Sequence, residues 1–170
     1  MIVVFYAHPY PHYSRAGATL LEGIRDLPGL TVRSLYDLYP DFDIDTDGER
    51  AAMESARLVV WMGPLYWYTV PALLKHWFEV VLEKGWAYGP GGTALAGKDC
   101  LWVATAGDHG QPFEAWVPPL ENTARVCGMN WLPPFALHGA DEARETALAE
   151  AGRELRKRLE EWAAAAREGS

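Results

Sequence analysis

Short apolar runs alternate with amphipathic segments along the chain, and this alternation predicts the order of its strands and helices. The first run, residues 2–6 (IVVFY), is continuous and rich in β-branched residues, as expected for a strand buried on both faces of a parallel sheet. Four further segments are expected to be strands: the buried runs 58–62 and 100–105, the more polar 30–35, and an irregular 130–137 that Pro133 and Pro134 interrupt.

Apolar residues at helical spacing lie between these runs. Ser14 can cap a helix N-terminus, and the spacing after it predicts a helix that stops at Pro28. The strongest pattern covers 71–83, where Pro71 lies near the start and Gly85 follows the end. Shorter helices are predicted over 49–56 and 120–127, and a long one over 141–167.

Strand alternates with helix five times, which favours an α/β fold. We expect a three-layer α/β/α sandwich on a parallel sheet, in a single domain over residues 1–170. For a five-stranded sheet of the flavodoxin-like order 2-1-3-4-5, the strand order reverses between strands one and three. In such sheets ligands bind beyond the carboxyl ends of the strands, where the strand order reverses. The segments 7–17, 63–70 and 105–110 are therefore the expected ligand site.

Charge and composition narrow the range of partners. The chain has 23 Asp and Glu against 15 Lys and Arg, and this net charge of −8 disfavours nonspecific binding to nucleic acid and direct docking on anionic lipid. No apolar run reaches about 18 residues and no basic leader precedes the first strand, so we expect a cytoplasmic protein without membrane insertion. Cys100 and Cys127 lie in apolar surroundings without CxxC spacing, which fits buried thiols better than a disulfide.

The segment 7–17 (AHPYPHYSRAG) connects the first strand to the first helix. Ser14 supplies a hydroxyl and Arg15 a guanidinium, and the amides of Arg15, Ala16 and Gly17 would lie at the positive end of the helix dipole. These groups predict an anion site that suits a phosphate. Gly17 costs about 1 kcal/mol relative to Ala inside a helix, which is explained if a ligand approaches its backbone closely. The alternative is that Ser14 only caps the helix and Gly17 is incidental.

Two histidines in this segment raise the question of a metal site. His8 and His12 are four residues apart, but Pro9 and Pro11 prevent the helix that an HxxxH zinc site needs, and no third ligand lies nearby in the sequence. We therefore predict no metal. His8, at the strand's end, could donate a hydrogen bond to a phosphate, whereas His12 is expected to shape the loop or meet solvent.

The segment 63–75 (GPLYWYTVPALLK) places Leu65, Tyr66, Trp67 and Tyr68 in a loop between a strand and a helix. Such an aromatic cluster is typical of a wall for a flat ring system, with backbone groups available to the polar edge of the ring. The alternatives are an aromatic loop packed under residues 86–88, or one buried in a dimer interface.

The segment 105–114 (TAGDHGQPFE) follows the fourth strand. Thr105 and Gly107 can bring a hydroxyl and a close backbone amide to a ligand, while Asp108 and His109 add titratable groups. A lone exposed histidine in a loop is nevertheless more often solvated than catalytic. Residues 92–99 match GxxxxGK, but an aspartate follows the lysine and a strand follows the motif, which excludes a P-loop; GxGxxG and GxSxG motifs are absent from the sequence.

Four stretches, YAHPYPHYS, PLYWYTVPALLKHWFE, GWAYGPGGTALAGK and CGMNWLPPFALHG, closely resemble the flavodoxin-like NAD(P)H quinone oxidoreductases, particularly the ancillary subunit of the glutathione-gated potassium efflux system. The resemblance covers residues 1 to about 114 and resumes over 127–137. It implies bound FMN, a homodimer with active sites at its interface, and ping-pong reduction of a quinone-type small molecule by NADH or NADPH. It also implies a potassium efflux antiporter as partner at the inner face of the membrane.

The resemblance assigns roles to particular residues. FMN phosphate and ribityl groups would meet His8, Ser14, Arg15, Ala16 and Gly17; the isoalloxazine edge would meet Leu65, Tyr66, Trp67 and Tyr68; the strand-four loop would contribute Thr105, Ala106, Gly107 and Asp108. Tyr66, Trp67 and His109 would shape the substrate side.

This chain also departs from the family pattern. The family usually has Asn where Gly17 stands and Thr-Thr-Gly-Gly over 105–108, and this chain is shorter between Glu114 and Cys127. Two alternatives remain at this point: a regulatory antiporter subunit with incidental reductase activity, or a flavodoxin-like electron carrier. The aromatic segment and nearby Trp86 favour a walled pocket for small substrates over a carrier.

Overall fold

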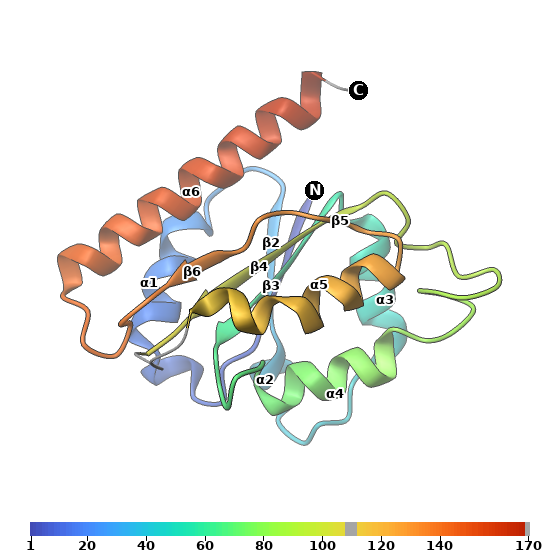
Figure 1. Cartoon of the computed structure of the whole chain (residues 1–170), viewed down its shortest axis with the longest axis horizontal. Coiled ribbons are helices and arrows are strands. Elements are labelled where there is room, and N and C mark those ends of the chain that lie inside the picture. Colours follow the sequence, from blue (N-terminus) through green and yellow to red (C-terminus); the bar gives the residue numbers. More distant parts are fainter. Residues whose placement is uncertain (108–111, 169–170) are drawn as a thin grey trace.

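The computed structural model describes residues 1–107 and 112–168, and its strands form one parallel sheet (Figure 1). The sheet order is β2-β1-β3-β4-β5. β5 pairs with the first residues of β4 and β6 pairs with its last residues, so β5 and β6 together form one edge of the sheet. The predicted flavodoxin-like order is confirmed. The strands are β1 (Ile2–Tyr6), β2 (Leu30–Ser34), β3 (Leu58–Pro64), β4 (Asp99–Thr105), β5 (Asn130–Trp131) and β6 (Phe135–Leu137).

Helices cover both faces of the sheet and give the predicted three layers (Figure 1). α1 (Arg15–Ile24) and α6 (Glu145–Glu168) lie side by side on one face. α3 (Thr46–Ser55), α4 (Ala72–Val81) and α5 (Val117–Val126) pack on the other. Three short turns complete the described chain: the one-turn α2 (Leu35–Leu38) and the 3₁₀ turns Pro11–Tyr13 and Phe113–Trp116.

The continuous apolar run of β1 reflects burial on both faces. Val3 and Phe5 face the core under α3, α4 and α5, whereas Val4 and Tyr6 face the core under α1 and α6. Successive side chains of a strand point to opposite faces, so a strand covered on both sides shows no polar alternation.

Element boundaries differ from the expected ones where prolines or local turns intervene. α1 ends at Ile24 and does not continue to Leu27, the residue before Pro28, which disfavours helical backbone. α5 starts at Val117, three residues earlier than predicted, because prolines are tolerated in a first helical turn. The expected strand 130–137 splits into β5 and β6 around Pro133 and Pro134, whose nitrogens cannot donate to a ladder.

A buried carboxylate joins β2 to α3 and α4. Glu49 is fully buried, and its Oε1 accepts hydrogen bonds from Arg33 Nε at 2.7 Å and from the Tyr39 hydroxyl at 2.6 Å. Its Oε2 accepts from Trp77 Nε1 at 2.8 Å. The sequence pattern predicted a helix only from Glu49 onward, whereas α3 begins at Thr46, and it did not predict this network.

Stability should fall at alkaline pH partly because of Tyr39. Burial, and then the hydrogen bond to Glu49, raise the pKa of Tyr39 to about 12, whereas an unfolded tyrosine titrates near 10. As the pH rises, Tyr39 therefore loses its proton first in the unfolded state. The contribution of the protonated Tyr39 to the free energy of unfolding is complete below about pH 10 and is lost as the pH approaches about 12. Urea unfolding measured between about pH 10 and 12 should show that the free energy of unfolding falls more steeply with pH in the wild type than in Tyr39→Phe. Equal slopes in the two proteins would refute a contribution from Tyr39.

Both cysteines are buried and free, as the sequence indicated. Burial raises the pKa of the Cys127 thiol to about 11, and it raises the pKa of the Cys100 thiol as well. Both therefore remain unreactive thiols near neutral pH. Within residues 1–107 and 112–168, no helix has both the length and the apolarity needed to cross a bilayer.

Candidate functional site

A cavity of about 350 Å³ opens at the carboxyl ends of β1, β3 and β4. Its lining brings together all three segments that the fold argument selected. The predicted site residues that line it are His8, Ser14, Arg15, Ala16, Leu65, Tyr66, Thr105, Ala106 and Gly107.

A glycine allows β1 and β3 to meet closely at this edge. The Ala7 amide donates to the Met62 carbonyl at 2.8 Å, and a Cβ built on Gly63 would lie only 2.5 Å from the Ala7 carbonyl oxygen. The Leu65 amide continues the contact by donating to the Thr105 carbonyl at 2.8 Å. The three strand ends are thereby held against one another, and their loops surround the cavity.

The N-terminus of α1 forms one wall. Ser14 caps the helix, because its Oγ accepts from the Gly17 amide at 3.1 Å and its carbonyl accepts from the Ala18 amide at 2.9 Å. The amides of Arg15 and Ala16 have no acceptor among the described residues, and both residues line the cavity. Two amides therefore remain available at the positive end of the helix dipole, as an anion site requires, and the anion site itself stays a prediction.

Arg15 and Gly17 are placed differently from the simplest expectation. The Arg15 guanidinium donates to the Ala143 carbonyl at 3.2 Å and so ties α1 to the loop before α6. Gly17 is buried and does not line the cavity. A Cβ at this position would lie 2.3 Å from Tyr6 Oη, so the glycine makes room for a protein hydroxyl, whereas the sequence suggested a close ligand.

His8 lies at the cavity as a neutral donor. Its Nδ1 accepts from the Tyr10 amide at 3.0 Å, which leaves the proton of the neutral ring on Nε2. Burial lowers the pKa of His8 below its ordinary value, so the ring is neutral at pH 7. His12 is instead exposed, and its Nε2 lies 3.6 Å from Asp37 Oδ1. The two histidines do not converge, and the described residues contain no His, Cys, Asp or Glu group suited to a metal.

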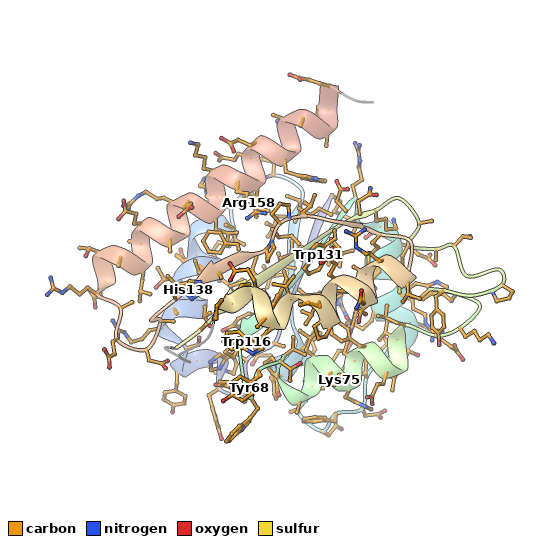
Figure 2. All side chains as sticks on the ribbon, in the orientation of Figure 1. Tyr68, Lys75, Trp116, Trp131, His138 and Arg158 are labelled. Carbon is orange, nitrogen blue, oxygen red and sulfur yellow. The ribbon has the colours of Figure 1, made fainter. Side chains whose placement is uncertain are left out.

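The aromatic loop is a strained two-residue turn. The amide of Tyr66 donates to the Thr69 carbonyl at 2.9 Å, and the Thr69 amide donates back at 3.0 Å. Between them Trp67 and Tyr68 have φ angles of 48° and 65°, the conformation of a type I′ turn that normally contains Asn-Gly. Trp67 is 90% exposed, and the Tyr68 ring lies 5.7 Å from that of Trp116 (Figure 2).

Only part of this loop faces the cavity. Leu65 and Tyr66 line it, whereas Trp67 and Tyr68 do not. The expectation that Trp86 lies near this loop is wrong, because Trp86 Nε1 donates to Glu54 at 2.8 Å and its ring packs under Arg50 on α3. Asp108 and His109 lie outside the described residues, so their predicted roles remain predictions.

Four lining residues were not named individually from the sequence: Tyr13 and Pro64, which lie in the selected segments, and Ala140 and Asp141, which lie outside them. The Ala140 amide donates to the Ala106 carbonyl at 3.0 Å, which holds the loop after β6 against the end of β4. Burial raises the pKa of Tyr66, and the Asp141 charge raises it further. No local motif marks Ala140 or Asp141, because their place depends on pairing between distant strands.

Most of the chain matches the model of one protein family. Residues 1–159 match the family described as having a flavodoxin-like fold. The chain belongs to this family. The flavodoxin-like assignment agrees with the observed sheet order and with a cavity at the switch point between β1 and β3.

Solved flavodoxin-like structures resemble this chain over nearly its full length. A protein from Streptomycin violaceusniger described as a thermophilic tryptophan halogenase is 34% identical, with 92% of this chain and 97% of that chain covered and a TM-score of 0.88. General stress protein 14 from Treponema denticola, in complex with FMN, is 30% identical, with 94% and 97% covered and a TM-score of 0.87. An NADPH-quinone reductase from P. pentosaceus is 24% identical, with 92% and 96% covered and a TM-score of 0.82.

Relieving the strained turn of this flavodoxin-like chain should stabilise it. The double substitution Trp67→Asn with Tyr68→Gly supplies residues that adopt positive φ readily, so we expect the free energy of unfolding to rise by about 1–2 kcal/mol. Urea denaturation measures the change. The matched variant Trp67→Phe keeps an aromatic residue at positive φ and should gain little. A double variant no more stable than the wild type would show that the turn is unstrained.

Proposed function

We propose that this chain is an FMN-dependent NAD(P)H:quinone oxidoreductase that transfers two electrons to quinones or related electrophiles. One observation carries the proposal: a single cavity at the switch point combines an anion cradle at the start of α1 with an aromatic wall at Tyr66. The FMN complex of the 30% identical T. denticola protein supports the cofactor. The name of the P. pentosaceus protein agrees with the activity, although that likeness supports only the fold.

The cavity residues fit a phosphate-bearing flavin. The amides of Arg15 and Ala16 are available to a phosphate, and the Nε2 proton of His8 is available as a further donor. At the other wall the amides of Leu65 and Tyr66 are already used within the protein. A flavin ring at this wall would therefore contact Leu65 and Tyr66, which line the cavity, without hydrogen bonds from their amides.

FMN would supply hydride acceptance and two-electron donation, while the protein binds, orients and excludes water. We propose that the nicotinamide and the quinone bind in turn against the same face of the flavin ring, and that Tyr66 and Trp67 shape the substrate side of the site. His109 is proposed to shape the same side. Asp141 adds a fixed negative charge to the rim and should disfavour anionic acceptors.

Exposed aromatic residues around the cavity support a homodimer with active sites at its interface. Tyr13 is 86% exposed and Trp67 is 90% exposed, and Tyr10 and Tyr68 are also exposed. Apolar patches of this kind commonly mark interaction surfaces. Light scattering on the eluting protein should give twice the mass of the chain, whereas a monomer would refute this part of the proposal.

The enzyme proposal is tested on purified protein supplied with FMN. Flavin fluorescence should be quenched on binding, anaerobic NADH or NADPH should bleach the bound flavin, and a quinone should restore its colour. Protein that stays colourless after FMN addition would refute the cofactor. Bound flavin that neither nicotinamide bleaches would refute the reductase.

A cytoplasmic regulatory subunit of a potassium efflux antiporter remains a second proposal, supported by the sequence resemblance. It predicts co-purification with a membrane antiporter and altered potassium efflux after deletion. A flavodoxin-like electron carrier remains a third alternative. No feature of the described cavity favours halogenation over reduction.

A further inference from the structure

Tyr6 has a buried hydroxyl that the described structure leaves without a partner. The residue is 3% exposed, and its Oη has no hydrogen-bond partner among the described residues. Buried hydroxyls are normally paired, because an unpaired one loses its hydrogen bonds to water without replacement. Phenylalanine would fill the same space without that penalty, so the hydroxyl calls for a reason beyond packing.

The hydroxyl is directed at the start of α1. A Cβ built on Gly17 would lie 2.3 Å from Tyr6 Oη and 2.6 Å from Ser14 Oγ, so the two hydroxyls flank one point. Gly17 keeps this point clear. The Tyr6 hydroxyl occupies the space beside the helix start.

We propose that Tyr6 is a positioning residue that commits Ser14 to donate its proton to a bound phosphate. A hydroxyl oxygen has two lone pairs, and Ser14 Oγ already accepts from the Gly17 amide at 3.1 Å. When the Tyr6 hydroxyl donates to the second lone pair, the Ser14 proton must point elsewhere. The cavity, which Ser14 lines, provides a phosphate oxygen as acceptor.

The consequence is selectivity for a phosphate-bearing ligand over the same ligand without phosphate. Burial raises the pKa of Tyr6 above its ordinary value by more than the adjacent Ser14 hydroxyl lowers it, so the Tyr6 hydroxyl stays protonated and can donate at neutral pH. The inference rests on the proposed function in identifying that ligand as FMN. Tyr6 itself does not line the cavity and acts through Ser14.

The test compares FMN with riboflavin by fluorescence quenching. Tyr6→Phe should weaken FMN binding by up to about tenfold, the upper end of the range for one neutral hydrogen bond, and leave riboflavin binding unchanged. The melting temperature of the ligand-free variant should stay equal or rise. Ser14→Ala should weaken FMN binding as well, and the double variant should bind no more weakly than Ser14→Ala alone, because Tyr6 acts through Ser14.

Several outcomes would overturn the inference: unchanged FMN binding in Tyr6→Phe, equal losses for FMN and riboflavin, or additive losses in the double variant. Tyr88→Phe is the matched control, since Tyr88 is half-buried and does not line the cavity. Wild-type protein that binds no FMN would refute the proposed function separately. Thermal shift with inorganic phosphate then decides the inference: stabilisation reduced in Tyr6→Phe supports it, and equal or absent stabilisation overturns it.

Discussion

Replacing Glu49 by alanine is expected to lower the free energy of unfolding by about 3–5 kcal/mol. The substitution leaves the Arg33 charge without its partner, and it removes the acceptor of the buried Trp77 indole and the Tyr39 hydroxyl. Breaking a buried ion pair from one side is costly because the remaining charge keeps its desolvation penalty. For a chain of this size the melting temperature should fall by roughly 10 °C, measured by calorimetry together with urea unfolding.

Two further variants isolate the contribution of the Arg33–Glu49 ion pair to the free energy of unfolding. Glu22 makes an exposed contact with Arg25 at 2.8 Å, and Glu22→Ala should change stability by less than about 0.5 kcal/mol. The double substitution Arg33→Met with Glu49→Leu should recover part of the loss, because no unpaired charge remains. A Glu49→Ala variant as stable as the wild type would mean that the network contributes nothing to folding.

Gly63→Ala should damage both the fold and the site. The new Cβ would lie 2.5 Å from the Ala7 carbonyl oxygen, and backbone atoms there cannot rotate away as a side chain could. Separating β1 from β3 should cost about 1–3 kcal/mol, the range for overpacked sites, and should weaken FMN binding more than tenfold because the cavity is built on this contact. Urea unfolding and fluorescence titration measure the two effects.

A neighbouring substitution provides the control for Gly63. Met62 precedes it on the same strand with its side chain 1% exposed, and Met62→Leu conserves volume, so it should cost less than about 1.5 kcal/mol and leave FMN binding unchanged. If Gly63→Ala binds FMN like the wild type, the close approach of β1 and β3 does not shape the cavity.

Local sequence signals were sufficient for most of the fold. The run 2–6, the Ser14 cap and the 71–83 helix depend on hydrophobic period and capping chemistry, which act over a few residues. The strand order needed more, because connection rules leave several arrangements of parallel strands, and the resemblance to flavodoxin-like proteins selected 2-1-3-4-5 among them. The three loops at the switch point could therefore be selected as the site before any contact was known.

The sequence by itself thus determined the α/β class and three of the segments that line the cavity. Tertiary structure alone decided which side chains within those segments face it. Gly17 is buried against Tyr6, Trp86 packs on α3, and Asp141 reaches the rim only because β6 pairs with β4. Contacts of this kind join residues far apart in the chain, and their partners are fixed by packing that periodicity and composition do not encode.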